Sequence, residues 1–177
     1  MSARTGPKKV ALVLHGCGVF DGSEIHEATS KAGAEVSAFA PNIQQDHVTD
    51  HSTGSNVTEK RSNFVSAGAS CEVLPDVKRV IGDFVHAKKP IGLCCIAPVL
   101  AARCLPGVHV TIGTDAVTAK AIKNMGAVHE NCEITGVCTD ENFKVVTAPA
   151  YMYGSATIAD IFDNIGLLVK RVLSLTN

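Results

Sequence analysis

The sequence predicts an α/β protein whose sheet is mostly parallel and is covered by helices on both faces. Short apolar runs that suit buried strands alternate along the chain with segments whose apolar residues recur at helical spacing. Such alternation is typical of parallel strands joined by crossover helices. The length of 177 residues suits one domain, so we expect residues 1–177 to form a single domain.

The strands are predicted from their apolar or alternating composition and from the turn residues that bound them. The predicted strands are Lys9–Leu14, Ala34–Ala40, the stretch that begins at Ile91, Val108–Ile112, His129–Thr135 and Phe143–Thr147. The last two are expected to pair through a polar turn at 140–142. Residues 42–70 are rich in polar and turn-forming residues, and we expect them to be irregular.

Start and stop signals locate the helices between these strands. The first expected helix begins at Ser23 or Glu24 and ends at Ala32-Gly33, and the second runs from Pro75 to Lys88. A third begins near Ala97-Pro98, and a fourth runs from its cap, Asp115, through Ala121. The last carries an apolar stripe from Ile158 to Val172. Because the carboxyl ends of parallel strands share one edge of a sheet, groups that follow those ends are candidates for one site.

Composition excludes several classes of partner. The 16 Lys and Arg residues nearly cancel the 17 Asp and Glu residues, and a net charge of −1 offers no electrostatic footprint for nucleic acid. No apolar run approaches the roughly 18 residues that span a bilayer, so no membrane partner is expected. Seven cysteines without paired C-x-x-C spacing indicate free thiols in a reducing compartment. The choice between a mitochondrial and a cytoplasmic location stays open.

Cys95 is the strongest candidate for chemistry. It lies where a buried strand turns abruptly into a helix, which is the place of a nucleophile elbow. The helix N-terminus favours the thiolate, and the backbone N–H of Ile96 can serve as an oxyanion donor. A buried structural cysteine is the alternative, and local sequence leaves the two about even. Cys94 points to the opposite face of the strand and is assigned to the core.

Two glutamates on the first helix are candidate partners for Cys95. Glu24 lies in the first turn, and Glu27 shares its face one turn later, so spacing leaves the choice between them open. A glutamate favoured only by the helix dipole is the alternative. Gly16 and Cys17 follow the first strand and could form a wall of the same pocket or simply pack within the loop. His26 is the weakest candidate for lining it.

Neither a metal nor a cofactor is predicted. His47 and His51 have the spacing of a metal-binding pair on a helix, but the residues between them form helix poorly and no third ligand has fitting spacing. The glycines around Gly16 lack the G-x-G-x-x-G pattern of dinucleotide-binding turns.

Five stretches together resemble the ElbB-like proteins, which belong to the PfpI and class I glutamine amidotransferase-like superfamily. They are GCGVFDGSEIHEA (16–28), FAPNIQQDHVTDH (39–51), KPIGLCCIAP (89–98), VTIGTD (110–115) and KVVTAPAYM (144–152). The third stretch is most similar to vertebrate mitochondrial members. The resemblance implies a flavodoxin-like fold, a nucleophile at Cys95, a carboxylate at Glu24 or Glu27, and a homodimer.

The elbow departs from that of amidotransferases and PfpI-type peptidases. Those enzymes carry His directly after the nucleophile, whereas this chain has Ile96, which argues against glutaminase and protease activity. Relatives without that His include glyoxalase III-type enzymes, which use Cys and Glu and no cofactor on small carbonyl compounds. The resemblance therefore implies a glyoxalase III-like enzyme with a small-molecule carbonyl substrate.

A second departure motivates an alternative function. The family carries a Gly-rich loop of P-G-G-F-G type that supplies half of the oxyanion hole, and this chain passes directly from Glu59–Arg61 to Ser62–Phe64. Internal deletions of this kind indicate, as the alternative, a redox-sensing or regulatory member without catalysis.

Overall fold

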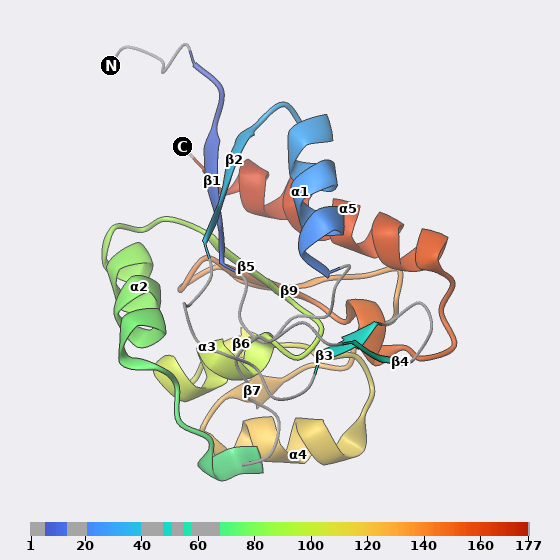
Figure 1. Cartoon of the computed structure of the whole chain (residues 1–177). Helices are drawn as coiled ribbons and strands as arrows, with labels where there is room; N and C mark the ends of the chain where they lie inside the picture. Colours follow the sequence, from blue (N-terminus) through green and yellow to red (C-terminus); the bar gives the residue numbers. More distant parts are fainter. Residues whose placement is uncertain (1–5, 14–20, 40–47, 51–54, 58–67, 177) are drawn as a thin grey trace. The chain divides into compact units, whose positions relative to one another are not determined.

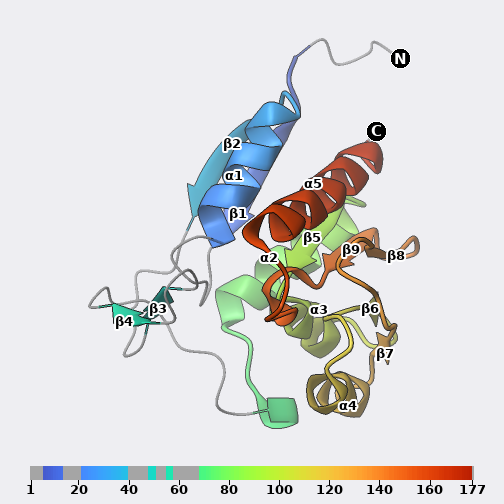
Figure 2. The same ribbon diagram turned by 90° about the vertical axis from the view of Figure 1, so that its right-hand side faces the viewer.

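The computed structural model describes residues 6–13, 21–39, 48–50, 55–57 and 68–176 (Figures 1 and 2). They fall into an N-terminal unit within Met1–Ser66 and a C-terminal unit within Ala67–Asn177. Each unit is described by itself below. Among the described residues, no helix has both the length and the apolar character that crossing a bilayer requires.

The N-terminal unit contains the predicted strand–helix–strand. Strand β1 (Lys9–Val13) pairs in parallel with β2 (Glu35–Phe39), and helix α1 (Asp21–Lys31) connects them. Gly33, at φ 77°, ends the helix, as the sequence predicts. The helix begins at Asp21, slightly earlier than expected.

The segment 42–70, expected to be irregular, contains three short elements among its described residues. Strands β3 (Val48–Asp50) and β4 (Ser55–Val57) form an antiparallel pair, and η1 (Gly68–Ser70) is a single 3₁₀ turn.

Parallel pairing dominates the C-terminal unit. Its strands are β5 (Ile91–Cys94), β6 (His109–Val110), β7 (Val128–His129), β8 (Cys138–Asp140) and β9 (Val145–Ala148). Strand β9 pairs in parallel with β5 and antiparallel with β8, and β6 pairs in parallel with β7. A buried hydrogen bond from the Thr111 backbone N–H to Thr147 Oγ1, 2.9 Å long, joins the end of β6 to the end of β9. The carboxyl ends of β5, β6 and β9 therefore share one edge.

The helices of this unit lie on both sides of the strands. They are α2 (Pro75–His86), α3 (Pro98–Cys104), α4 (Ala116–Asn124) and α5 (Ile158–Ser174), with a 3₁₀ turn η2 (Ala150–Met152) before α5. Figures 1 and 2 show α5 on one side of β5 and β9, and α3 and α4 on the other. The predicted cap of α4 is confirmed, because Asp115 accepts a hydrogen bond from the Thr118 N–H at 2.8 Å.

Helix α5 begins at a capping box that was not predicted. The Thr157 hydroxyl accepts from the Asp160 N–H, and the Asp160 carboxylate accepts from the Thr157 N–H. Its buried face packs on β5 and β9. The close approach of α5 to β5 depends on Gly92, because a Cβ at that position would lie 2.8 Å from Val172 Cγ2.

The predicted strand at His129–Thr135 is wrong beyond its first residue. The chain leaves the sheet after His129, and a turn closes where the Gly136 N–H donates to the Glu133 carbonyl at 2.9 Å. The partner of β9 is instead β8. Its last residue, Asp140, accepts from two backbone N–H groups of the following turn through Oδ1, and these local bonds set the hairpin.

Candidate active site

Cys95 lies at an abrupt turn between the end of β5 and the start of α3. Its φ of 58° is left-handed, a conformation that costs a non-glycine residue roughly 1–2 kcal/mol. The Ala97 N–H closes the turn on the Cys94 carbonyl at 3.0 Å, and Pro98 opens the helix. A strained strand-to-helix turn is the geometry of a nucleophile elbow.

The two adjacent cysteines of the elbow differ in burial. The Cys94 side chain belongs to the core, as predicted, whereas Cys95 is partly exposed. In the part of the chain that the structure describes, the backbone N–H of Ile96 has no hydrogen-bond acceptor. A partly exposed cysteine therefore lies next to an available backbone donor, which is an arrangement that suits attack on a carbonyl group.

The end of β7 contributes a buried histidine, His129, to the same edge, because β7 pairs in parallel with β6. The Ile112 N–H donates to His129 Nε2 at 3.3 Å, so this nitrogen is an acceptor and the ring is neutral, with its proton on Nδ1. Burial, and secondarily the charge of Lys123, lowers the pKa of His129. This histidine was not predicted, because the strand expected at His129–Thr135 begins at His129, whereas the observed strand ends there.

Tyr153 also lies at this edge and was not predicted. Its hydroxyl donates to the Cys132 carbonyl at 2.9 Å and lies 3.2 Å from Glu133 Oε2. Its ring passes close to Gly113, where a Cβ would lie 3.0 Å from Tyr153 Cε2. The glycine therefore lets the aromatic ring lie across the end of β6.

Four other thiols are held in the neutral form. Burial raises the pKa of Cys71, Cys104 and Cys132, and it raises the pKa of Cys138 to about 12. Since the thiolate is the nucleophile, these four cysteines are poor nucleophiles at neutral pH.

The other predicted site residues lie in the N-terminal unit. Glu24 is in the first turns of α1, and Glu27, on the next turn, forms an exposed ion pair of 2.7 Å with Lys31. His26 is exposed, and Gly16 and Cys17 lie outside the described residues. The pairing of Cys95 with either glutamate, and the pocket role of His26, stay predictions.

Metal-ligating groups do not gather in the described ranges, where no three His, Cys, Asp or Glu side chains come together. His47 and His51 lie outside them.

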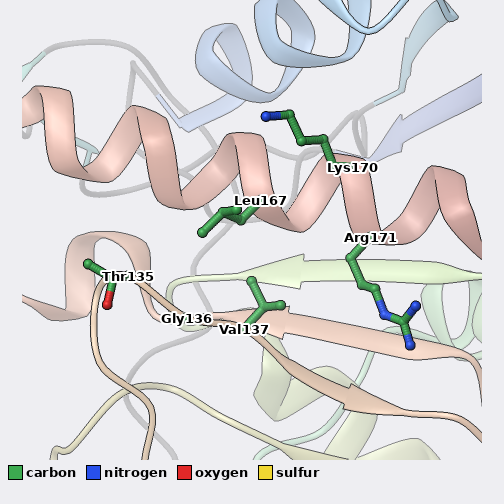
Figure 3. A pocket seen from close by; sticks show the side chains of 6 residues that line it. All are labelled: Thr135, Gly136, Val137, Leu167, Lys170 and Arg171. Atoms are coloured by element: carbon green, nitrogen blue, oxygen red, sulfur yellow. The ribbon is translucent and has the colours of Figure 1, made fainter.

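A shallow groove of about 440 Å³ lies away from the elbow (Figure 3). Its lining residues come from α5 and from the turn before β8: Thr135, Gly136, Val137, Leu167, Lys170 and Arg171. The Arg171 side chain points to the strands, where it pairs with Glu141. The groove contains neither Cys95 nor a group that could assist its chemistry.

Comparison with known proteins gives close relatives by sequence. None of the protein-family models compared with the sequence matches it. The chain is 39% identical to the mitochondrial ES1 protein homolog of Rattus norvegicus, covering 95% of this chain and 84% of that protein. It is also 39% identical to the human mitochondrial glutamine amidotransferase-like class 1 domain-containing protein 3, covering 95% and 83%.

These alignments also bear on the expected deletions. Each extends over 224 residues, more than the 177 residues of this chain. Both relatives therefore contain residues within the matched region that this chain lacks.

Solved structures show the same fold. An isoprenoid biosynthesis protein with an amidotransferase-like domain from Ehrlichia chaffeensis superposes with a TM-score of 0.78 at 24% identity, covering 95% of this chain and 99% of that one. Drosophila melanogaster DJ-1beta superposes with a TM-score of 0.56 at 14% identity, covering 96% and 95%. The predicted flavodoxin-like α/β fold is confirmed by these likenesses.

Proposed function

We propose, because this chain belongs to the ElbB-like family of glutamine amidotransferase-like proteins, that it is a cofactor-independent enzyme acting on small reactive carbonyl compounds through Cys95. The observation that carries the proposal is the left-handed, partly exposed Cys95 at a strand-to-helix turn. Such strain at a reactive side chain is typical of functional sites. The Ile96 N–H beside it supplies one oxyanion donor.

The reaction that suits these groups converts a 2-oxoaldehyde into a 2-hydroxy acid. The Cys95 thiolate adds to the aldehyde carbon, and the carbonyl oxygen takes a proton to give a hemithioacetal. A carboxylate then removes the proton from that carbon and returns one to the neighbouring ketone carbon, which gives a thioester. Water cleaves the thioester, releasing the hydroxy acid and the thiol. One water is consumed, and no electron acceptor is needed.

Glu24 is our first candidate for the proton transfer, with Glu27 as the alternative. Both lie on α1, one turn apart. Glu27 already pairs with Lys31 on an exposed face, which favours Glu24 for the proton transfer. His26, Gly16 and Cys17 are proposed only as parts of the surrounding pocket.

Turnover of methylglyoxal tests this function. We expect Cys95→Ala to abolish formation of lactate, while Cys132→Ala, which removes another partly exposed thiol, leaves it unchanged. Loss of turnover in Glu24→Gln but not in Glu27→Gln would assign the proton transfer to Glu24. Absence of turnover in the parent protein refutes the enzymatic proposal.

A redox-sensing or regulatory role is the second candidate. The observation that favours it is the raised pKa of Cys71, Cys104, Cys132 and Cys138, which leaves these thiols poorly reactive toward peroxide. In this role peroxide oxidises the Cys95 thiolate to a sulfenate and is itself reduced to water. A second equivalent gives the sulfinate. After mild peroxide, mass spectrometry should find oxygen at Cys95; even modification of all cysteines contradicts this role.

The shortened chain affects the choice between these functions. The Gly-rich loop that the family uses for the second oxyanion donor has no counterpart in this sequence, and the alignments with longer relatives support its loss. A non-catalytic protein with a reactive Cys95 would need no such donor.

Compartment and assembly follow from relatives only as proposals. The rat, human and Danio rerio relatives are all named as mitochondrial proteins, so we favour the mitochondrion over the cytoplasm. A homodimer and a single domain over residues 1–177 remain proposals, which light scattering and limited proteolysis test directly.

A further inference from the structure

Asn164 is a buried amide in the middle of α5, and both of its polar ends are used. Its side chain is 1% exposed. Oδ1 accepts a hydrogen bond from the Ala150 N–H at 3.0 Å, and Nδ2 donates to the Gly136 carbonyl at 2.8 Å. One side chain therefore holds two separate turns of the chain against the helix.

The turn at Ala150 depends on this contact. Ala150 is fully buried and left-handed, with a φ of 43°, although it is not a glycine. The left-handed conformation costs an alanine roughly 1–2 kcal/mol, and a buried N–H without an acceptor adds a comparable cost. The amide of Asn164 removes the second cost, so it stabilises the turn in the conformation observed.

The same turn follows the strand that holds the elbow. Two residues before Ala150, the Ala148 carbonyl accepts the hydrogen bond of the Cys95 N–H at 3.0 Å. Cys95 and Ala150 are both left-handed, and each follows the end of one of the parallel-paired strands β5 and β9. Displacement of the chain after β9 would therefore move the acceptor that fixes Cys95.

We propose that Asn164 is a positioning residue for Cys95. By holding the left-handed turn at Ala150, it keeps the Ala148 carbonyl in place and thereby maintains the strained conformation and reactivity of the thiol. The inference rests on the proposed function only in taking Cys95 as the reactive centre. It applies to the enzymatic and the redox role alike.

The experiment measures iodoacetamide alkylation of Cys95 against pH in the full chain, by peptide mass spectrometry. We expect Asn164→Leu to slow alkylation at pH 7 about tenfold, which corresponds to one unit in the pH profile. Val169→Ala, at a buried position on the next turn of α5, serves as the control. It should lower the urea midpoint without moving the profile.

A second variant separates positioning from general destabilisation. Glycine adopts left-handed angles without a steric cost, so Ala150→Gly in the Asn164→Leu background should recover part of the lost rate. If Asn164→Leu does not fold, Asn164→Ser takes its place, with the same expectation.

Three outcomes overturn the inference: a Cys95 profile in the Asn164 variant that matches the parent, an equal shift in Val169→Ala, or a parent Cys95 that does not react. A parent with reactive Cys95 that neither turns over methylglyoxal nor oxidises selectively refutes only the proposed functions.

Discussion

The Cys95 N–H donates a 3.0 Å hydrogen bond to the Ala148 carbonyl, which ties the elbow of β5 to the end of its parallel neighbour β9. This bond continues the ladder of the sheet one residue beyond β5, to a residue that has already turned to φ 58°. The elbow is thus held by the sheet on one side and by the start of α3 on the other.

Glycine at position 95 should make the protein more stable than alanine does. Both substitutions remove the thiol, but only glycine relieves the left-handed strain, so we expect Cys95→Gly to exceed Cys95→Ala by about 1 kcal/mol in free energy of unfolding. Urea denaturation of the two variants measures the difference. Equal midpoints would mean that the elbow is not strained.

Relief of backbone strain at a position away from the elbow should stabilise the folded protein without changing the reactivity of Cys95. Lys88 follows α2 and is left-handed at φ 53°, a position where glycine is usual. We expect Lys88→Gly to raise the free energy of unfolding by about 1 kcal/mol. The rate of Cys95 alkylation should stay at the parent value; a changed rate would show that the two regions are coupled.

Gly92→Ala should destabilise the packing of α5 on the sheet. The added methyl group would lie 2.8 Å from Val172 Cγ2, so the helix must shift, at a cost of about 1–3 kcal/mol. Thermal unfolding of Gly92→Ala with and without Val172→Ala checks the cause, because the second substitution makes room and should restore part of the loss. Gly82→Ala, in α2 with open space around its Cβ, should instead be neutral or stabilising.

Stability should fall as the pH falls below about 6.5, the value of an unperturbed histidine. The pKa of His129 is lowered in the folded protein, so between that lowered value and 6.5 the unfolded state binds more protons than the folded state. Protonation also removes the acceptor of the Ile112 N–H. In His129→Gln the free energy of unfolding should depend less on pH over this window; an unchanged dependence contradicts the assignment.

Cys138 should resist alkylation in the folded protein between pH 7 and pH 9. Its pKa of about 12 leaves almost no thiolate in that range, and the side chain is buried. Iodoacetamide should modify it only after urea unfolds the chain. Labelling of Cys138 in the folded state at the rate of the partly exposed Cys132 would show that this part of the sheet opens.

Local signals in the sequence determined most elements and the strand-to-helix turn at Cys95. Pro75 and Pro98 mark helix starts, Asp115 caps α4, and the run from Ile91 places Cys94 inward and Cys95 at the turn. These features depend on neighbouring residues alone, so they can be predicted without knowledge of the fold. The assignment of the hairpin partner of β9 failed, because the bonds of Asp140 to the following turn place that partner at 138–140 and not at 129–135.

Only the tertiary structure decided how the elbow is supported. Asn164 forms hydrogen bonds with Ala150 and Gly136, which lie 14 and 28 residues away in the sequence. The missing side chain of Gly92 leaves room for Val172, which belongs to a helix much later in the chain. An alanine at left-handed angles carries no local signal, since its intrinsic preference is for other conformations. Long-range contacts stabilise such conformations by compensating their local cost. The turn at Cys95 could therefore be predicted from neighbouring residues, whereas the contacts that surround it could not.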